Sequence, residues 1–334
     1  MNSTGQLWLE RPTLDIDLAL PVEQRYAAIP PQAIGACKAL LSAILAQIPM
    51  TARPLADAVR VRTGNRFHPS ACALAELHGL SWRDVMLANV SYDLFLASLG
   101  CSTVALPTPA GPVVARNMDW MPEGLLARAS YLLRYVRNGT LAYAHAAWPA
   151  SIGVVSGLSA HGFAVIVNAV RSPEGVNLSG YPVLLFLRRV LEDAADFRAA
   201  LKLLTAQTLA MSALITLVGS ENDERVVIER SPAKHALRWG QPGQALMTTN
   251  HYRALYPLHP LDAGIPYPEG CPRFNRLCRL LEHYDETAAA AAGDEQLLRI
   301  LSDPEVIQEI TAQHIIIRPR QRELKLFAPS RLVA

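Results

Sequence analysis

The fold of this chain is decided by residues 100–120, GCSTVALPTPAGPVVARNMDW. Two runs typical of strands, 101–107 and 112–119, flank the segment 108–111, whose Thr-Pro-Ala-Gly composition is typical of a turn. The stretch therefore predicts a β-hairpin. It also divides the chain, because the residues before it follow a helical periodicity and those after it follow the period-two pattern of strands. Cys101 lies at this junction.

A cysteine at such a junction suits a hydrolase that cuts its own chain. If the Gly100–Cys101 bond is broken, Cys101 becomes a new amino terminus that carries both a nucleophilic sulfur and an amine base. A free α-amine has a pKa of roughly 7.7–8.0 and is a competent base near neutrality. The alternative is that Cys101 is a small buried hydrophobic residue, as a lone cysteine usually is.

Two charged residues follow Cys101 on the returning strand. Arg116 can favour the thiolate electrostatically, and Asp119 can orient the new amine. Residues three apart on a regular strand point to opposite faces, so both reach Cys101 only if the strand bends or ends between them. A structural ion pair between Arg116 and Asp119 is the alternative.

Composition limits the classes of function. The chain has 334 residues, 51% of them hydrophobic, and a net charge of +2, which argues against a nucleic-acid partner. No secretory signal, membrane-spanning run or basic amphipathic face is expected. The cysteines show no paired spacing, so we expect no disulfide framework, metal site or cofactor, and a reducing cytosol as the location. They lie at positions 37, 72, 101, 271 and 278.

The remaining pattern predicts antiparallel sheet with helices between the hairpins. An extended lead-in over 8–20 precedes a helix that opens at Pro30-Pro31, and a capping box at Ser81–Asp84 opens a helix that reaches about residue 98. Two stacked antiparallel sheets with helices outside fit this order. Further helices are expected over 56–61, 71–77, 181–191, 196–205, 273–284 and 295–301, and strands over 152–156, 163–170, 212–219, 225–229, 234–239, 245–250, 314–318 and 323–327.

Several motifs resemble known amidases. The runs 101–105 and 116–120, with 79–93 and 14–17, resemble the acid ceramidase and N-acylethanolamine acid amidase family. The runs 182–192, 228–232 and 248–252 resemble the isopenicillin N acyltransferase group. Both groups, with choloylglycine hydrolase and penicillin V acylase, are amino-terminal nucleophile (Ntn) hydrolases. The resemblance implies an α+β fold, a four-layer αββα sandwich preceded by a helical amino-terminal segment.

The resemblance also implies a division of the chain and roles for its residues. Residues 1–100 would be a propeptide or α subunit and 101–334 the catalytic β subunit, the two remaining associated. Cys101 would be the nucleophile and, after cleavage, the base, while Arg116 and Asp119 orient and polarise it.

Further site residues come from the same resemblance. Asn250 matches the asparagine that lines the oxyanion hole, although it could also cap a turn. Asn168 matches a second asparagine beside that hole. Arg273 matches the arginine near the thiol, with Arg276 as the reserve. Met118 and Trp120 flank the site and either wall an acyl pocket or belong to the core.

Three functions remain open from the sequence. The first is a cysteine amidohydrolase that acts on a linear non-peptide N-acyl amide, and the second is an acyltransferase in which an amine replaces water. The third is a binding protein that keeps the fold without catalysis. Acid ceramidases carry an insertion with a glutamate near the thiol in the stretch that corresponds to Asn168–Tyr181. This stretch is short here and offers only Glu174 as a candidate, so the resemblance disfavours ceramide-like substrates. A Cys101–His251 pair of papain type is disfavoured because the amine already supplies a base.

Overall fold

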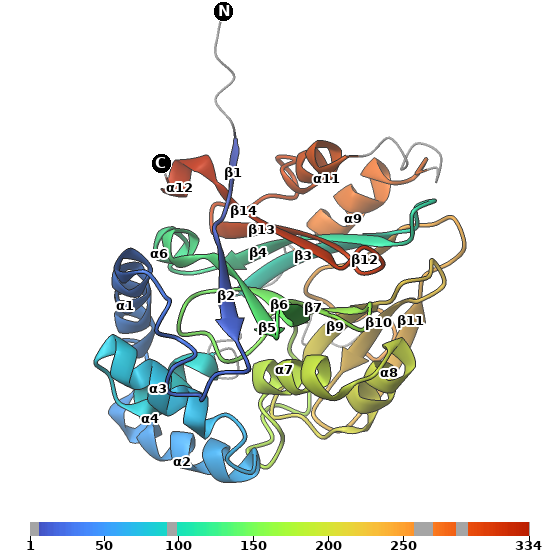
Figure 1. Ribbon diagram of the computed structural model, residues 1–334. Coiled ribbons are helices and arrows are strands. Elements are labelled where there is room, and N and C mark those ends of the chain that lie inside the picture. The colour runs from blue at the N-terminus through green and yellow to red at the C-terminus, as the bar shows by residue number, and fades with distance from the viewer. Residues whose placement is uncertain (1–6, 92–98, 257–269, 285–292, 334) are drawn as a thin grey trace, which may run out of the picture.

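The hairpin around residue 108 lies at the centre of the structure. In the computed structural model, which describes residues 7–91, 99–256, 270–284 and 293–333, strand β3 (Leu99–Leu106) pairs with β4 (Val113–Trp120) in antiparallel register. Both strands are interior to a six-stranded sheet (Figure 1). The predicted hairpin is therefore confirmed. Strand β3 begins two residues before Cys101, so the Gly100–Cys101 bond lies inside it.

The six-stranded sheet is antiparallel throughout and takes strands from both ends of the chain. The carboxy-terminal hairpin β13–β14 lies beside β4, and the short strand β1 covers its outer edge. The strand order is β1 (Trp8–Glu10), β14 (Glu323–Pro329), β13 (Thr311–Arg318), β4, β3 and β12 (Leu246–Thr248).

The eight-stranded sheet is antiparallel except at one edge. There β2 lies parallel to β5, so the amino-terminal segment adds a strand to each sheet. The order is β11 (His235–Trp239), β10 (Arg225–Arg230), β9 (Ala213–Val218), β8 (Ala164–Ala169), β7 (Ser156–Ser159), β6 (Thr140–Ala147), β5 (Tyr131–Arg137) and β2 (Thr13–Asp17).

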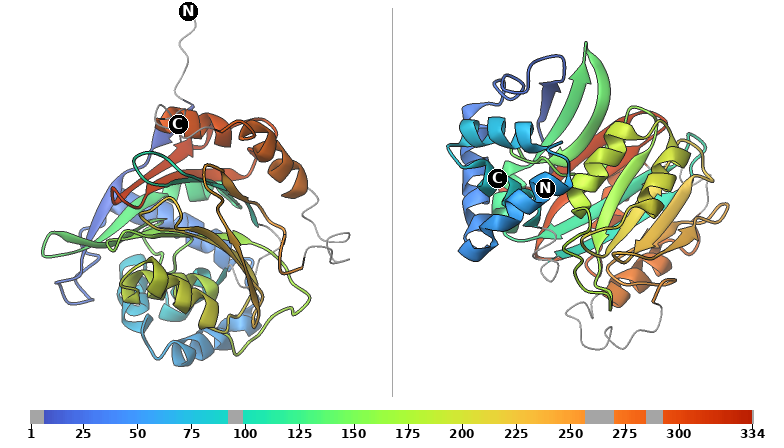
Figure 2. Two further views of the ribbon diagram at one scale, coloured as in Figure 1. Left: turned by 90° about the vertical axis from the view of Figure 1, so that its right-hand side faces the viewer. Right: turned by 90° about the horizontal axis from the view of Figure 1, so that it is seen from below.

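Helices cover both outer faces of the stacked sheets, which confirms the predicted four-layer sandwich. Helices α9 (Gly270–Leu280) and α11 (Asp294–Leu301) lie over the six-stranded sheet, and α7 (Val183–Asp193) and α8 (Phe197–Ala206) lie over the eight-stranded sheet (Figure 1). The amino-terminal helices pack beside α7 (Figure 2). They are α1 (Pro31–Leu45), η1 (Met50–Ala52), α2 (Arg53–Arg62), α3 (His68–His78) and α4 (Trp82–Asn89). The other helices of the described residues are α6 (Glu123–Ala129) and α12 (Ser330–Val333).

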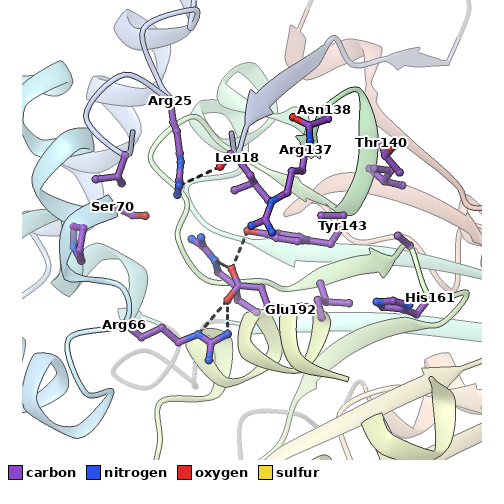
Figure 3. Close-up of a pocket in the computed structure, with 17 residues that line it drawn as sticks. Leu18, Arg25, Arg66, Ser70, Arg137, Asn138, Thr140, Tyr143, His161 and Glu192 are labelled. Atoms are coloured by element: carbon purple, nitrogen blue, oxygen red, sulfur yellow. Dashed lines mark hydrogen bonds and ion pairs between the residues drawn. The ribbon is translucent and has the colours of Figure 1, made fainter. Parts of the chain in front are cut away.

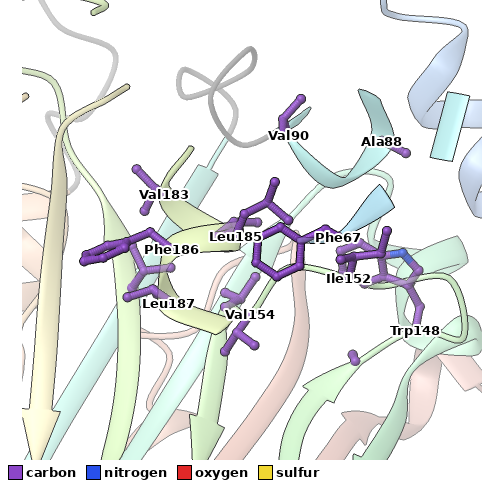
Figure 4. Close-up of a cluster of buried hydrophobic side chains, with 14 of the residues drawn as sticks. Phe67, Ala88, Val90, Trp148, Ile152, Val154, Val183, Leu185, Phe186 and Leu187 are labelled. Carbon is purple, nitrogen blue, oxygen red and sulfur yellow. The ribbon is translucent and has the colours of Figure 1, made fainter. Parts of the chain in front are cut away.

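Apolar side chains fill the spaces between the layers. Val114 and Ile315 of one sheet meet Leu158 and Ile166 of the other, all fully buried. A second cluster joins the amino-terminal helices to the rest of the chain, where Phe67 packs near residues of α7 (Figure 4). Burial of one such aromatic side chain contributes roughly 2–3 kcal/mol to stability.

The structure departs from the prediction in two hairpins. Strands β5 and β6 were not predicted, although Asn138-Gly139 between them, with φ values of 51° and 75°, is a strong signal for a two-residue hairpin turn. The first strand of the next hairpin lies at Ser156–Ser159, later than the predicted 152–156. The capping box at Ser81 is present, but α4 ends at Asn89; residues 92–98 of the predicted helix lie outside the described residues.

No single helix in the described part of the chain is long and apolar enough to cross a bilayer. Helix α1 and the segment 50–62 pass the same test only as a pair bent by 100°.

Asn89 joins the amino-terminal helices to the sandwich. Its buried side chain donates to the carbonyls of Val85 and Ala150 and accepts from the backbone N–H groups of Ile152 and Gly153. Asn89→Ala leaves two buried N–H groups unpaired, so we expect urea denaturation to show a loss of about 3 kcal/mol in the free energy of unfolding.

The matched control is Asn177→Ala, in an exposed turn where the side chain accepts one bond from Ser179. Its loss should stay below about 1 kcal/mol. Equal losses in the two variants would contradict a joining role for Asn89.

Candidate active site

Cys101 faces the space between the two sheets. It is the third residue of β3, and its side chain is only 5% exposed. Across the hairpin it lies opposite Met118, and Thr103 lies opposite Arg116. Because side chains alternate along a strand, Cys101, Met118 and Arg116 share one face of the sheet. The sulfur is therefore enclosed together with the guanidinium predicted to act on it.

Arg116 contacts the sulfur directly. Its Nη2 lies 2.6 Å from Cys101 Sγ, and its Nη1 donates to Ser156 Oγ at 2.8 Å and to the Val155 carbonyl at 3.4 Å. Burial raises the pKa of the Cys101 thiol above its usual value, and the cation of Arg116 opposes that rise. Arg116 is thus placed to favour the thiolate in a site without solvent screening.

Asp119 lies on the opposite face of the same sheet. It pairs with Gly100 across the hairpin, so its carboxylate is beside the residue before Cys101 rather than beside the sulfur. Its Oδ1 accepts a 2.6 Å hydrogen bond from Thr311, and its Oδ2 is 3.8 Å from Arg273 Nη1. The three-residue spacing therefore places the two charges on opposite faces of the sheet. Arg116 contacts the sulfur, and Asp119 lies beside the Gly100–Cys101 peptide bond.

Asn250 and Arg273 contact the backbone of Cys101. The N–H of Cys101 donates to Asn250 Oδ1 at 3.0 Å, and Arg273 donates to the same oxygen at 2.8 Å and to the Cys101 carbonyl at 2.7 Å. The Asn250 amide carries two N–H bonds, and the bond to the Ala169 carbonyl at 2.8 Å uses one of them. The structure brings these predicted residues together around Cys101.

Asn168 bonds to residues next to the site rather than to Cys101 itself. Its Oδ1 accepts from Thr103 Oγ1 at 2.9 Å, and its Nδ2 donates to the carbonyls of Thr248 and Thr249. These bonds join β8 and β3 to the segment that carries Asn250. The Asn168 side chain thus positions Asn250, and its amide donors are already engaged.

Met118 and Trp120 line a small apolar cavity at the sulfur. The cavity has a volume of about 10 Å³, and Val155, Val167 and Ala169 form its other side. Such a space holds no more than one water molecule. Trp120 also packs edge-on against Trp148, with ring centroids 6.0 Å apart. A molecule larger than water can therefore reach the sulfur by this cavity only if its walls move.

Other candidate residues lie elsewhere. Arg276 pairs with Asp303, so the reserve choice is not at the thiol. Glu174 contacts Tyr256 and Lys234.

His251 bonds to Thr249 and packs against Phe274, and burial lowers its pKa to about 4. These contacts do not include the sulfur of Cys101. Of the other cysteines, Cys37 is buried, Cys72 is exposed and Cys278 is half-buried; the Cys271 side chain lies outside the described part of the chain.

Several site residues were missed in the sequence. Ser156, Thr103, Ser102 and Thr311 each bond to a predicted site residue. Each lies between 40 and 192 residues along the chain from its partner. A short polar side chain carries no sequence signal of its own. Only the tertiary structure brings them together: Thr311 pairs with Asp119 across two strands, Ser156 and Thr103 reach their partners between the two sheets, and Ser102 reaches helix α9.

A wide groove lies between residues 18–70 on one side and β5, β6 and α7 on the other. It has a volume of about 1060 Å³ and is lined by residues of both parts of the chain (Figure 3). Arg66 of the amino-terminal segment pairs with Glu192 at 2.8 Å and with Asp193, both at the end of α7. Ion pairs therefore reinforce the apolar contact between residues 7–91 and the sandwich.

Comparison with known proteins agrees with this architecture. The sequence model of the family described as acyl-coenzyme A:6-aminopenicillanic acid acyl-transferase matches residues 107–313, beginning after Cys101. An N-acylethanolamine-hydrolyzing acid amidase of Caenorhabditis elegans is 27% identical over 173 residues, which are 47% of this chain and 49% of that protein. An acyl-coenzyme A:6-aminopenicillanic-acid-acyltransferase 40 kDa form of Emericella nidulans is 26% identical over 234 residues, 68% of this chain and 63% of that protein.

A solved structure shares the fold. The N-acylethanolamine-hydrolyzing acid amidase ortholog of Caenorhabditis elegans superposes with a TM-score of 0.53 at 20% identity, covering 66% of this chain and 93% of that chain. The chain spans about half the length of the first curated relative. The resemblance to Ntn hydrolases is confirmed. Because the family model matches more than half of the sequence, this chain belongs to the acyl-coenzyme A:6-aminopenicillanic acid acyl-transferase family.

Proposed function

We propose that this protein is a cysteine amidohydrolase that cuts its own Gly100–Cys101 bond and then cleaves a linear non-peptide N-acyl amide. One observation carries the proposal: both reactive atoms of Cys101 already have partners of the right kind. The sulfur lies 2.6 Å from a guanidinium, and the backbone nitrogen donates to Asn250 Oδ1 at 3.0 Å. A buried structural cysteine needs neither contact.

Self-cleavage is an attack of the Cys101 sulfur on the carbonyl carbon of Gly100. A carbon–sulfur bond forms, the Gly100–Cys101 carbon–nitrogen bond breaks, and the thiol proton passes to the departing nitrogen. Water then hydrolyses the thioester, which yields a Gly100 carboxylate and restores the thiol. The products are fragments 1–100 and 101–334. Cys101 is now an amino-terminal residue.

The new amine then acts as the general base. A free α-amine has a pKa of roughly 7.7–8.0, so a useful fraction is neutral near pH 7. Asn250 Oδ1 already accepts from this nitrogen, and the Asp119 carboxylate lies beside Gly100. These two acceptors orient the amine while Arg116 holds the sulfur. Base and nucleophile on one residue need little further positioning.

Substrate turnover also proceeds through a thioester on Cys101. The thiolate attacks the acyl carbon of the substrate, the amine passes the thiol proton to the leaving nitrogen, and water releases the acid from the acyl-Cys101 intermediate. The Asn250 amide stabilises the oxyanion without a proton transfer. The relatives that match this chain include an N-acylethanolamine-hydrolyzing amidase, which supports an N-acyl amide as the substrate.

An acyltransferase is the second candidate. The family model and the Emericella nidulans relative are both described as acyltransferases, and an acyl-Cys101 intermediate serves either reaction. Only the acceptor that reaches the intermediate, water or an amine, separates the two functions.

The two fragments remain associated in this proposal. Strands β1 and β2 are paired in the two sheets, and Asn89 and Arg66 bond to the larger fragment. We also propose a cytosolic location, since the described cysteines are free thiols.

Self-cleavage is the first test. Denaturing electrophoresis and intact-mass measurement of the purified protein should show two fragments that end at Gly100 and begin at Cys101, and gel filtration should keep them together. Cys101→Ala should remain a single chain without turnover, whereas Cys37→Ala, which removes a different buried cysteine, should still be cut. An intact chain that is fully active would exclude the terminal amine as the base.

Asn250→Ala tests the oxyanion role. Loss of this donor should lower kcat by roughly 10²–10³ while the protein still folds. Asn222→Ala removes an asparagine that bonds to Thr108 at a distant turn and should leave the rate unchanged. A near-normal rate in Asn250→Ala would remove that residue from the oxyanion hole.

The acyl-enzyme itself separates the three functions. Intact-mass measurement during incubation with a panel of N-acyl amides should reveal an acyl adduct on fragment 101–334. Product analysis with and without an added amine then distinguishes release of the acid from transfer to the amine. A cut protein that forms no adduct with any member of the panel would favour a binding protein.

A further inference from the structure

The two oxygens of the Asp119 carboxylate have different surroundings. Oδ1 accepts the 2.6 Å hydrogen bond from Thr311 Oγ1. Oδ2 is buried and has no hydrogen-bond partner among the described residues. Its ion-pair partner Arg273 Nη1 is 3.8 Å away, beyond hydrogen-bond distance. A buried carboxylate oxygen without a hydrogen bond costs free energy. Its retention indicates that another donor is expected there at some stage.

Thr311 is held in a single hydrogen-bonding arrangement. It lies opposite Asp119 in the pairing of β13 with β4, next to a β-bulge between Thr311 and Gln313. The backbone N–H of Gln308 donates to Thr311 Oγ1 at 3.0 Å, and the Thr311 N–H donates to the Gln308 carbonyl at 3.0 Å. A hydroxyl has one hydrogen, and here it is directed to Asp119. The orientation of the carboxylate is thereby fixed.

The fixed carboxylate lies against Gly100. A Cβ added to Gly100 would lie 3.0 Å from Asp119 Oδ2 and 3.0 Å from Gln308 Oε1, which is closer than ordinary van der Waals contact. Asp119 Oδ2 therefore lies next to Gly100, whose carbonyl is attacked in the proposed self-cleavage and whose neighbour Cys101 supplies the new amine. Any side chain at position 100 would press on that oxygen.

We propose that Thr311 is a positioning residue: its hydroxyl locks Oδ1 so that Oδ2 stays beside the Gly100–Cys101 bond and receives the ammonium group once the bond is cut. The inference rests on the proposed function and deepens it by adding a residue that does not contact the sulfur. Gln308 sets the direction of the Thr311 hydroxyl through its backbone N–H. Gly100 leaves the space that the carboxylate needs.

The charges around Asp119 give the role a measurable signature. Burial raises the pKa of Asp119, and Arg273 on α9, Thr311 on β13 and Arg116 on β4 all lower it. The Cys101 thiol is the other titratable group coupled to it. Without the Thr311 hydroxyl, the carboxylate takes up a proton at a higher pH. The acid limb of the rate profile should then move upward by about one pH unit.

The decisive comparison is Thr311→Ser against Thr311→Ala in the full chain, because these variants differ only by the hydroxyl. The serine variant should be cut at nearly the wild-type rate. The alanine variant should be cut at least tenfold more slowly, measured by intact mass over time, and its kcat should show the shifted acid limb. Thr311→Val adds a variant of nearly the original volume.

Controls separate this inference from the proposed function. Thr216→Val removes a buried hydroxyl that has no hydrogen-bond partner in the described structure, and it should change neither the cutting rate nor the pH profile. If the wild-type chain is never cut, the proposed function fails. If the wild type is cut, and the serine and alanine variants match it in rate and acid limb, the proposed function stands and the role of Thr311 is refuted.

Discussion

The register between β3 and β4 is the constraint on which the site depends. With Cys101 opposite Met118, alternation places Arg116 on the inner face with the sulfur and Asp119 on the outer face with Gly100. A slip by one residue would exchange these faces and put a carboxylate beside the thiol, where it would disfavour the thiolate. The apolar residues of β4 face both cores, so a slip would also bury the wrong side chains. Core packing and catalytic geometry therefore select one register.

The charged side chains of the site are stabilised by hydrogen bonds within the protein rather than by solvent. Arg116 and Asp119 are fully buried and Arg273 is 4% exposed. Removing such groups from water is costly unless each is paired and hydrogen-bonded. Arg116 meets a sulfur, a hydroxyl and a carbonyl, and Arg273 meets two backbone or amide oxygens and Ser102. Removal of one hydrogen-bond partner would leave a buried guanidinium group with an unsatisfied donor in an apolar environment.

The sequence predicts the local features of this structure well and the distant ones poorly. The capping box at Ser81 and the hairpin at 101–119 were predicted because their signals lie within a few residues. The Asn138-Gly139 hairpin was missed although its signal is equally local. Thr311 could not be found, since it is 192 residues from Asp119 and reaches it only through the pairing of β13 with β4. The resemblance supplied Asn250 and Arg273, which no spacing rule would join.

The amino-terminal segment is held to the rest of the structure by strand pairing and packing as well as by the chain itself. Before Cys101, the chain contributes one strand to each sheet and a group of helices packed on α7. A cut inside β3 would remove none of these contacts, because β1 and β2 pair with β14 and β5, and Asn89 bonds to Ala150 and Ile152. The change in the proposed cleavage would be local: a neutral peptide nitrogen would become an ammonium group beside Asp119 Oδ2, a buried acceptor that has no hydrogen bond from the described residues. A hydrogen bond from that ammonium group would then offset the free-energy cost of the buried oxygen that lacks one before cleavage.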